Sequence, residues 1–280
     1  MKTVIKKLTM PFVMAALAVL TVATAGAATS TTLVITPSSP VYDSNNVVGV
    51  SGDAAPGYQY GSLASNGGAK TDMYFTPEAL FGREVTLGEV ASISYWTKKG
   101  STHTVDTADW YLAIYTKKYP DQTISFYGAR IEAEPYFSIN LSDPANIWNQ
   151  WTTDGATNQL RFYESTYGYF GSYTDPNFAS FVAGNSLSGT HGPSVPYASQ
   201  PILYFSIQTG SAWAAGFTGQ LDGLSISLTD GSVANVNFEP YPVATDIGSC
   251  MKDGWQGLFR SDGSPFKNQG DCIQFVNTGK

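Results

Sequence analysis

The sequence predicts an all-β protein built as an antiparallel two-sheet β-sandwich with a small disulfide-closed C-terminal extension. Charged residues make up 13% of the chain, about half of the roughly 25% usual for globular proteins, which disfavours a coiled coil, a charged helical bundle or a disordered chain. Between residues 31 and 242, short β-forming runs alternate with Gly, Pro, Asn, Asp and Ser. Such short strands separated by turn-forming residues are typical of β-sandwiches and β-barrels. Helical periodicity is nearly absent beyond the N-terminal segment.

Residues 1–27 have the pattern of a secretory signal peptide. Three lysines precede an apolar segment over 12–23, and Ala25-Gly26-Ala27 offers a small-x-small cleavage site. A retained membrane anchor is the alternative, but Thr9, Pro11 and Thr21 dilute the uncharged stretch. Cleavage would remove three of 15 cations and none of 22 acids, which leaves a net charge of 12 − 22 = −10. We therefore expect a secreted, extracellular protein, or one of the periplasm or cell envelope, with no membrane span after signal removal.

The main domain is expected to be a sandwich over residues 28–242. In the stretch 201–209, Leu203, Phe205 and Ile207 alternate with polar residues and tyrosine, so one face would enter a core. Two prolines, Pro240 and Pro242, end the last strand. The clearest strands are expected over 85–99, 110–117, 123–134 and 201–209, followed by a hairpin over 224–238.

A cap over residues 243–280 is expected to follow the sandwich. It holds both cysteines, Cys250 and Cys272, and an even pair in an oxidising compartment is most simply a disulfide. The closed loop of about 22 residues would contribute roughly 3 kcal/mol to stability in the chain-entropy estimate. A metal site is the alternative, but two cysteines without a nearby His supply too few soft ligands.

Two motifs resemble segments of secreted bacterial proteins. The stretch Leu221-Asp222-Gly223-Leu224-Ser225-Ile226 is similar to the closing strand of bacterial jelly-roll and concanavalin-like modules. Gly254-Trp255, followed by Phe266-Lys267-Asn268-Gln269-Gly270-Asp271-Cys272, resembles a terminal segment of uncharacterised secreted bacterial proteins in which Cys…Gly-Trp…Phe-Lys-Asn-Gln-Gly-x-Cys recurs. The resemblance implies a jelly-roll or concanavalin-like sandwich with a disulfide-closed tail, and it assigns no activity to particular residues.

Glu132 and Glu134 are the candidate catalytic residues. They stand two apart on a predicted strand, so their side chains would share one face at a spacing of roughly 6 to 7 Å. Paired carboxylates at such a separation perform glycoside hydrolysis. A solvated strand edge is the competing interpretation, because Pro135 follows directly.

Aromatic residues are the most abundant candidates for ligand contacts, with 6 Trp, 17 Tyr and 15 Phe. Tyr167, Tyr169 and Tyr173 are interleaved with Gly and Ser, and Trp213 follows Gly210 closely. Rings on such loops would form platforms for sugar rings or other polymer segments. Alternatively, part of the Tyr-rich run over residues 162–181 pairs across a sheet.

The sequence implies no organic cofactor. A structural Ca²⁺ is the candidate metal, because extracellular sandwiches can hold loops together with oxygen-ligated calcium. Asp222 is the first candidate ligand, and Asp106 and Asp109 suit a turn or a calcium site better than acid/base chemistry. The spacing matches no EF-hand loop. His103 and His191 have neither the neighbours of a serine-type triad nor the spacing of a zinc site.

The pI is near 4.7, and the chain has no basic run beyond its first seven residues. These two features exclude nucleic acid binding, and three functions remain. The first is non-catalytic recognition of extracellular polysaccharide or cell-surface glycan through aromatic loops. The second is polysaccharide hydrolysis or elimination by Glu132 and Glu134. The third is a structural envelope or matrix protein that self-associates through exposed edges and aromatic residues.

Overall fold

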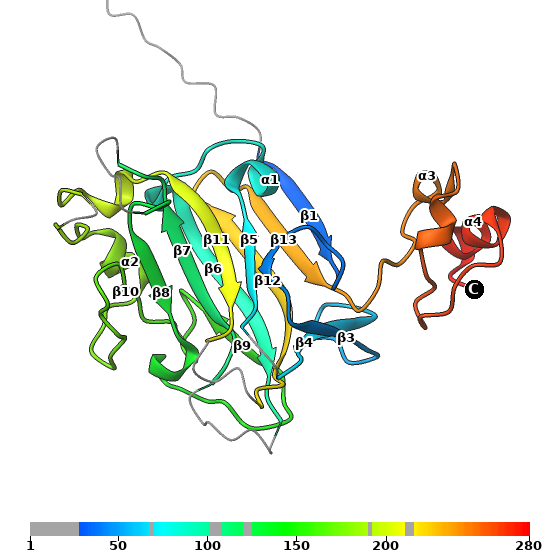
Figure 1. The fold of residues 1–280 in the computed structure, drawn as a ribbon, viewed down its shortest axis with the longest axis horizontal. Coiled ribbons are helices and arrows are strands. Elements are labelled where there is room, and N and C mark those ends of the chain that lie inside the picture. Colours follow the sequence, from blue (N-terminus) through cyan, green and yellow to red (C-terminus); the bar gives the residue numbers. More distant parts are fainter. Residues whose placement is uncertain (1–27, 68–69, 101–107, 120–124, 190–191, 211–215) are drawn as a thin grey trace, which may run out of the picture.

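The computed structural model describes residues 28–67, 70–100, 108–119, 125–189, 192–210 and 216–280, and the predicted signal peptide lies outside them. Within these ranges, thirteen strands form two sheets that face each other (Figure 1). The predicted two-sheet β-sandwich is thereby confirmed.

Sheet A is organised around the long strand β12 (Gln220–Leu228). One edge of β12 pairs with β6 (Val90–Lys98), which pairs in turn with β9 (Asn149–Thr152). The other edge pairs first with β4 and then with β13. The remaining strands of this sheet are β1 (Ser30–Ile35), β3 (Val47–Ser51), β4 (Gly61–Ser65) and β13 (Val233–Phe238). In contrast to the antiparallel prediction, β1 runs parallel to β13.

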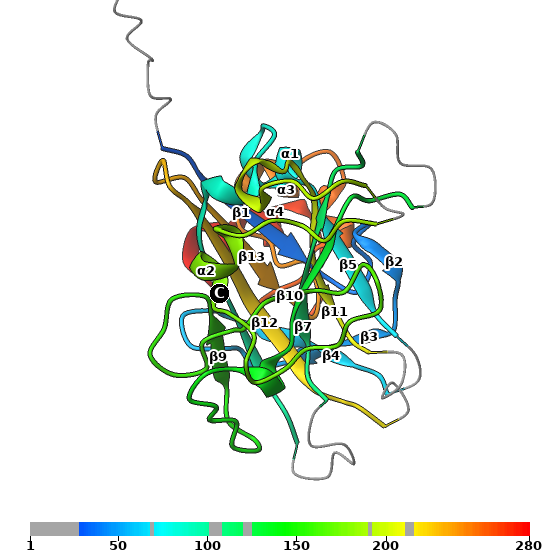
Figure 2. The same cartoon turned by 90° about the vertical axis from the view of Figure 1, so that its left-hand side faces the viewer.

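Sheet B is antiparallel at every described pairing, in the order β10-β8-β7-β11-β5-β2. Figure 2 shows its strands β7, β11, β5 and β2 in this succession. Its strands are β2 (Tyr42–Ser44), β5 (Asp72–Phe75), β7 (Tyr111–Thr116), β8 (Arg130–Ala133), β10 (Tyr163–Glu164) and β11 (Ile202–Gln208). Strand alternation gives this sheet two different faces. In β7, Leu112 and Ile114 enter the core between the sheets, whereas Tyr111, Ala113 and Tyr115 form a second cluster on the opposite face.

The core between the sheets is rich in large rings. Each is almost completely buried, and burial of such side chains dominates the stability of a domain of this size. The largest are Trp110, Trp151, Tyr95, Phe75, Phe162, Phe205 and Phe238. Two short helices, α1 (Pro77–Phe81) and α2 (Phe178–Val182), add Phe81, Phe178 and Phe181 to the same core.

Two predicted strands begin later than expected. The strand predicted over 85–99 starts at Val90, because Thr86 and Glu89 form a capping box around a 3₁₀ turn (Leu87–Glu89). The strand predicted over 123–134 is confined to β8. Ahead of it, Thr116 accepts hydrogen bonds from the backbone of Gly128 and Ala129, so the chain turns before it enters the sheet.

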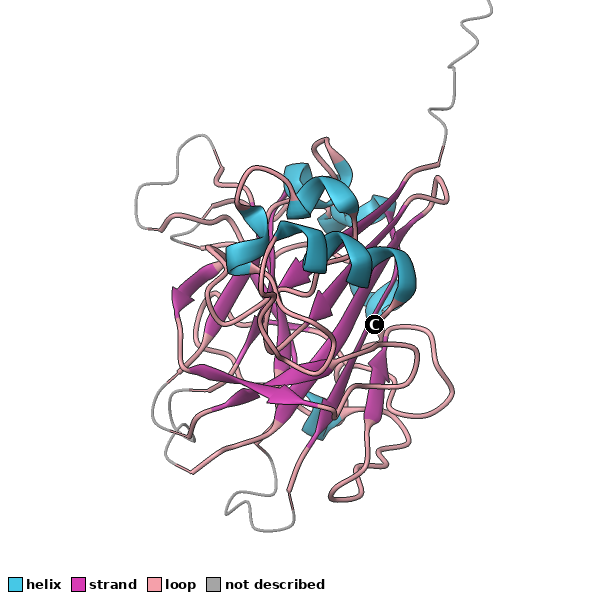
Figure 3. Cartoon of the chain, turned by 90° about the vertical axis from the view of Figure 1, so that its right-hand side faces the viewer, coloured by secondary structure: helices cyan, strands magenta, loops and turns pink. Residues whose placement is uncertain are grey.

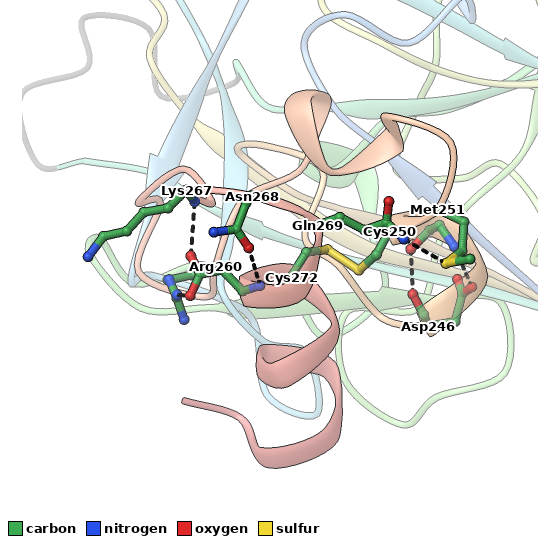
Figure 4. Close-up of a disulfide and its surroundings, with 10 residues drawn as sticks. Asp246, Cys250, Met251, Arg260, Lys267, Asn268, Gln269 and Cys272 are labelled. Carbon is green, nitrogen blue, oxygen red and sulfur yellow. Dashed lines mark hydrogen bonds and ion pairs between the residues drawn. A yellow bond between two sulfur atoms is a disulfide. The ribbon is translucent and has the colours of Figure 1, made fainter.

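The C-terminal region has its own small core, formed around Cys250, Phe266, Cys272 and Phe275. The predicted disulfide between Cys250 and Cys272 is present, with 5.8 Å between the two Cα atoms (Figure 4). The region contains α3 (Ile247–Cys250), a 3₁₀ turn (Gly254–Gly257) and α4 (Gln269–Thr278), seen in front of the sheets in Figure 3.

Helix α4 was not predicted, although its signals are present in the sequence. Asn268, labelled in Figure 4, caps its N-terminus by accepting a hydrogen bond from the Asp271 backbone. Gly279 ends the helix at a left-handed φ of 71°. Among the described residues, no helix has the length and apolar character needed to cross a membrane.

Candidate functional site

The outer face of sheet B, which points away from the core, brings together chemically active side chains from successive strands. Backbone pairing aligns Tyr163 with Glu132, Glu132 with Ala113, Ala113 with Ser206, and Ser206 with Tyr74. Because these residues share one cross-strand row, their side chains point to the same side of the sheet. This row crosses β10, β8, β7, β11 and β5.

A cleft of about 450 Å³ opens over the β10–β8–β7 end of this face. Its lining combines four charged side chains with seven aromatic or small residues from strands and loops, and it contains both predicted carboxylates. The lining residues are Lys70, Tyr111, Arg130, Glu132, Glu134, Tyr163, Ser165, Gly168, Tyr169, Phe170 and Gly210.

Glu132 is buried in the floor of this cleft, where it forms an ion pair with Arg130. The two residues are two positions apart on β8 and therefore lie on the same face. Arg130 also lies 5.9 Å from the centroid of the Tyr115 ring and donates a weak 3.4 Å hydrogen bond to the hydroxyl of Tyr111. The predicted solvated strand edge is therefore wrong for Glu132, because its side chain is buried and its charge is paired with Arg130.

Glu134 has a different environment from Glu132. The hydroxyl of Tyr163 donates a 2.5 Å hydrogen bond to Glu134 Oε1. Burial and the neighbouring charge of Glu132 raise the pKa of Glu134 above its ordinary value, although the Tyr163 hydrogen bond opposes the shift. The cleft thus holds one carboxylate paired with a guanidinium and another that retains its proton to a higher pH than usual.

A hydrogen-bonded network of tyrosine and glutamine fixes the floor between the strands. Tyr111 donates to Gln208 Oε1 (2.9 Å), and Gln208 Nε2 donates to the hydroxyl of Tyr115 (3.0 Å) and to Ser206 Oγ (2.8 Å). Gln208 is completely buried, and its amide is satisfied on both sides. Such a network holds the rings that face the cleft in one arrangement.

The wall of the cleft is the loop that follows β10. Its turn is held by the Gly168 backbone donating to the Ser165 carbonyl, and Gly168 adopts a left-handed φ of 80°. Asp175 fixes the far end of the loop by accepting hydrogen bonds from the Tyr169 hydroxyl (3.0 Å) and the Ser172 backbone (2.6 Å). The loop therefore presents Tyr169, and next to it Phe170, which is 82% exposed, at the mouth of the cleft.

Of the predicted aromatic residues that the structure describes, Tyr169 alone lies in the cleft. Tyr169 lines it and packs 5.7 Å from the Tyr163 ring. Tyr167 lies against Gly189, and Tyr173 packs on Tyr136. Trp213 lies outside the described residues, although Gly210, the last described residue before that segment, lines the cleft. His103, His191 and Asp106 also lie outside the described ranges.

Asp222 lies away from this cleft, inside sheet A. Its carboxylate accepts hydrogen bonds from the backbone N–H groups of Ala55 (2.9 Å), Gly223 (2.8 Å) and Phe238 (3.2 Å). These hydrogen bonds stabilise the segment of β12 at which its pairing partner changes from β4 to β13. Burial raises the pKa of Asp222 to about 7.

The predicted calcium site at Asp222 stays a prediction. The part of the chain that the structure describes contains no group of three or more His, Cys, Asp or Glu side chains placed to hold a metal ion. Asp109 is fully buried, where it accepts hydrogen bonds from the Thr97 hydroxyl (2.8 Å) and the Trp110 backbone (2.7 Å).

Sequence reasoning missed several residues of the cleft, above all Arg130, Tyr111 and Tyr163. The alternation Arg130-x-Glu132-x-Glu134 carried a signal for the first of them, because all three positions share a face. Tyr111 and Tyr163 reach the cleft only through pairing between distant strands. Comparison with protein-family models, with curated proteins and with solved structures finds no match to this chain.

Proposed function

We propose that the protein is a secreted or cell-envelope binding protein that recognises polysaccharide in the cleft on the outer face of sheet B. The observation that carries this proposal is the combination of exposed rings at the mouth with fixed polar groups in the floor. Tyr169 and Phe170 offer flat apolar surfaces, and sugar rings stack on such surfaces because both partners bury apolar area. Arg130, Glu132 and the Tyr111 hydroxyl supply donors and acceptors for sugar hydroxyl groups.

Preorganisation supports the same function. The ion pair of Arg130 with Glu132 and the network through Gln208 hold these side chains by contacts within the protein, so little side-chain freedom would be lost on binding. The loop carrying Tyr169 is fixed in the same way by Asp175.

The test is a binding screen of the purified protein against soluble and insoluble polysaccharides, with affinity electrophoresis and calorimetry as readouts. We expect at least one neutral polysaccharide to bind, and Tyr169→Ala to weaken that binding about tenfold, since loss of a stacking ring removes on the order of 1 to 2 kcal/mol. Ile147→Ala is the matched control, because Ile147 is similarly exposed (55%) and lies outside the cleft. Absence of binding to every polysaccharide, or equal affinities of Tyr169→Ala and the wild type, would refute the proposal.

Hydrolysis of the bound chain is the second candidate, and the contrast between Glu134 and Glu132 favours it. Glu134, whose pKa is raised, would donate a proton to the glycosidic oxygen, and Glu132 would take a proton from the water that attacks the anomeric carbon. Reducing-sugar release from a bound polysaccharide tests this. The candidate predicts that Glu134→Gln abolishes release while binding is retained. Binding without release by the wild-type protein would leave the non-catalytic function standing and remove this one.

A further inference from the structure

A second hollow, which the proposed function does not use, lies on the same outer face of sheet B. It has a volume of about 620 Å³ and lies at the β5–β2 end, where Tyr42, Tyr74, Tyr204 and Phe126 line it. Asp43 is the charged residue in its lining. The charged cleft and this aromatic cleft therefore occupy opposite ends of one sheet face.

Strand register sets the distance between the two clefts. Glu132, in the charged cleft, and Tyr74, in the aromatic cleft, belong to the same cross-strand row and are separated by Ala113 and Ser206. Three strand spacings of about 4.8 Å place them about 14 Å apart. Several linked sugar rings span that distance, whereas a single sugar does not.

Aromatic rings lie between the two clefts, with the buried Tyr115 beneath the exposed Phe126. Tyr115 lies 5.9 Å from the Arg130 guanidinium on one side and 5.7 Å from the Tyr74 ring on the other. Phe126 stacks on Tyr115 with an interplanar angle of 28° and a centroid separation of 5.8 Å. Because Phe126 remains 58% exposed, it presents a flat apolar surface to a ligand that crosses from one cleft to the other.

The charges of the two clefts indicate the chemical class of that ligand. Among the described residues that line them, Lys70 and Arg130 are the cations, and each is paired with an acid, Asp72 and Glu132 respectively. An acidic polymer would therefore meet no cation free to neutralise its carboxylates, and it would face Glu134 and Asp43 as well. A neutral sugar chain can instead hydrogen-bond through its hydroxyl groups in the charged cleft and stack its ring faces in the aromatic cleft.

We infer that one neutral oligosaccharide chain crosses sheet B from the charged cleft to the aromatic cleft, with Phe126, Tyr74 and Tyr204 forming a second, remote sugar subsite. This inference rests on the proposed polysaccharide-binding function. It adds that the ligand is an extended, uncharged chain, and it assigns the aromatic end to sugar units distant from Glu132.

The experiment is calorimetry with cello-, xylo-, malto- and chito-oligosaccharides of two to six units, with oligogalacturonates as the acidic comparison. For the series that binds, we expect the six-unit chain to bind about tenfold more tightly than the two-unit chain. Phe126→Ala should weaken the six-unit chain about five- to tenfold and leave the two-unit chain unchanged. Phe126 is suited to substitution because most of its surface is already exposed, and Ile147→Ala again serves as the control.

The outcomes separate this inference from the function on which it rests. If short neutral oligosaccharides bind with Tyr169-dependent affinity but chain length and Phe126→Ala have no effect, the proposed function stands and the second subsite is wrong. Binding of oligogalacturonates as tight as that of the neutral chains overturns the assigned ligand class. Failure of every oligosaccharide to bind overturns the inference, and the proposed function falls with it only if the polysaccharide screen is negative as well.

Discussion

The hydroxyl of Tyr163 lies 2.5 Å from Glu134 Oε1, in the cleft where Arg130 is paired with Glu132. Tyr163 comes from the edge strand β10, and Glu134 follows the neighbouring strand β8. The hydrogen bond therefore joins two segments about thirty positions apart in the sequence, and it orients the one carboxylate of the cleft that has no cationic partner in the described ion pairs.

Replacement of Tyr163 by Phe is expected to raise the pKa of Glu134 further. The hydroxyl favours the charged carboxylate, whereas burial and Glu132 disfavour it, so removal of the hydroxyl leaves only the two unfavourable effects. Carboxyl ¹³C NMR titration of the wild-type and variant proteins measures the change directly. An unchanged or lower pKa in the variant would show that the hydrogen bond does not control the titration of Glu134.

Stability is expected to fall as the pH rises from about 4 to 7, in part because of Asp222. Burial raises its pKa to about 7 from the ordinary value of 3.8, so the folded state binds more protons than the unfolded state within that window. The favourable contribution is complete below the unfolded-state pKa and is lost as the pH passes the folded-state pKa. Burial also raises the pKa of the nearby Glu239, to about 8, and the charge of Asp222 adds to that shift.

The Asp222→Asn variant isolates this contribution. Loss of one backbone hydrogen bond should destabilise the protein by about 1 to 3 kcal/mol at pH 5, and the decline in Tm between pH 4 and 7 should become shallower. Melting curves with added Ca²⁺ and with EDTA distinguish the two roles of Asp222. A calcium-dependent rise in Tm that the variant loses would support the predicted metal site, and equal curves would support the hydrogen-bonding role alone.

Reduction of the disulfide between Cys250 and Cys272 is expected to loosen the C-terminal region without unfolding the sandwich. The cysteines belong to a small cluster that is separate from the core between the sheets, and the bond contributes roughly 3 kcal/mol to that region. Limited proteolysis with and without reductant should show cleavage after residue 242 only in the reduced protein. Simultaneous loss of the sandwich would mean that the two parts unfold as one unit.

Secretion is tested by the mass of the exported protein. The signal peptide predicted over 1–27 requires a mature N-terminus at or near Ala28. Intact-mass analysis of culture supernatant and cell fractions should find this species outside the cytoplasm. A full-length protein retained in the cells would contradict both the predicted cleavage and the predicted location.

Local patterns in the sequence were sufficient to predict much of the fold. Alternation in the stretch 201–209 correctly predicts that Phe205 and Ile207 enter the core between the sheets and that Ser206 and Gln208 lie on the opposite face of sheet B. It failed at Leu203, which packs with the tyrosines of the outer face, because the register of β11 shifts between Ile202 and Tyr204. An irregularity of this kind moves a side chain to the other face without any change in residue type.

The candidate site was only partly predictable for a related reason. Glu132 and Glu134 share a face through local geometry, so the sequence revealed them together. Arg130 shares that face by the same local geometry. Tyr163, which lines the cleft, and Gln208, which supports Tyr111 from below, are placed by long-range strand pairing that no local pattern encodes. For the Tyr-rich run, the sequence predicts too many cleft residues. Tyr167, Tyr169 and Tyr173 are close in sequence, but only Tyr169 of these three lines the cleft.

The measurement that most directly tests the account is the affinity of Tyr169→Ala and Tyr173→Ala for a polysaccharide that the wild-type protein binds. The two side chains are almost equally exposed, at 47% and 52%, but only Tyr169 lines the cleft. If the cleft on sheet B is the binding site, Tyr169→Ala loses about tenfold in affinity, and Tyr173→Ala binds like the wild type. Loss of affinity in Tyr173→Ala, with Tyr169→Ala unaffected, would contradict this account and place binding elsewhere on the Tyr-rich loop.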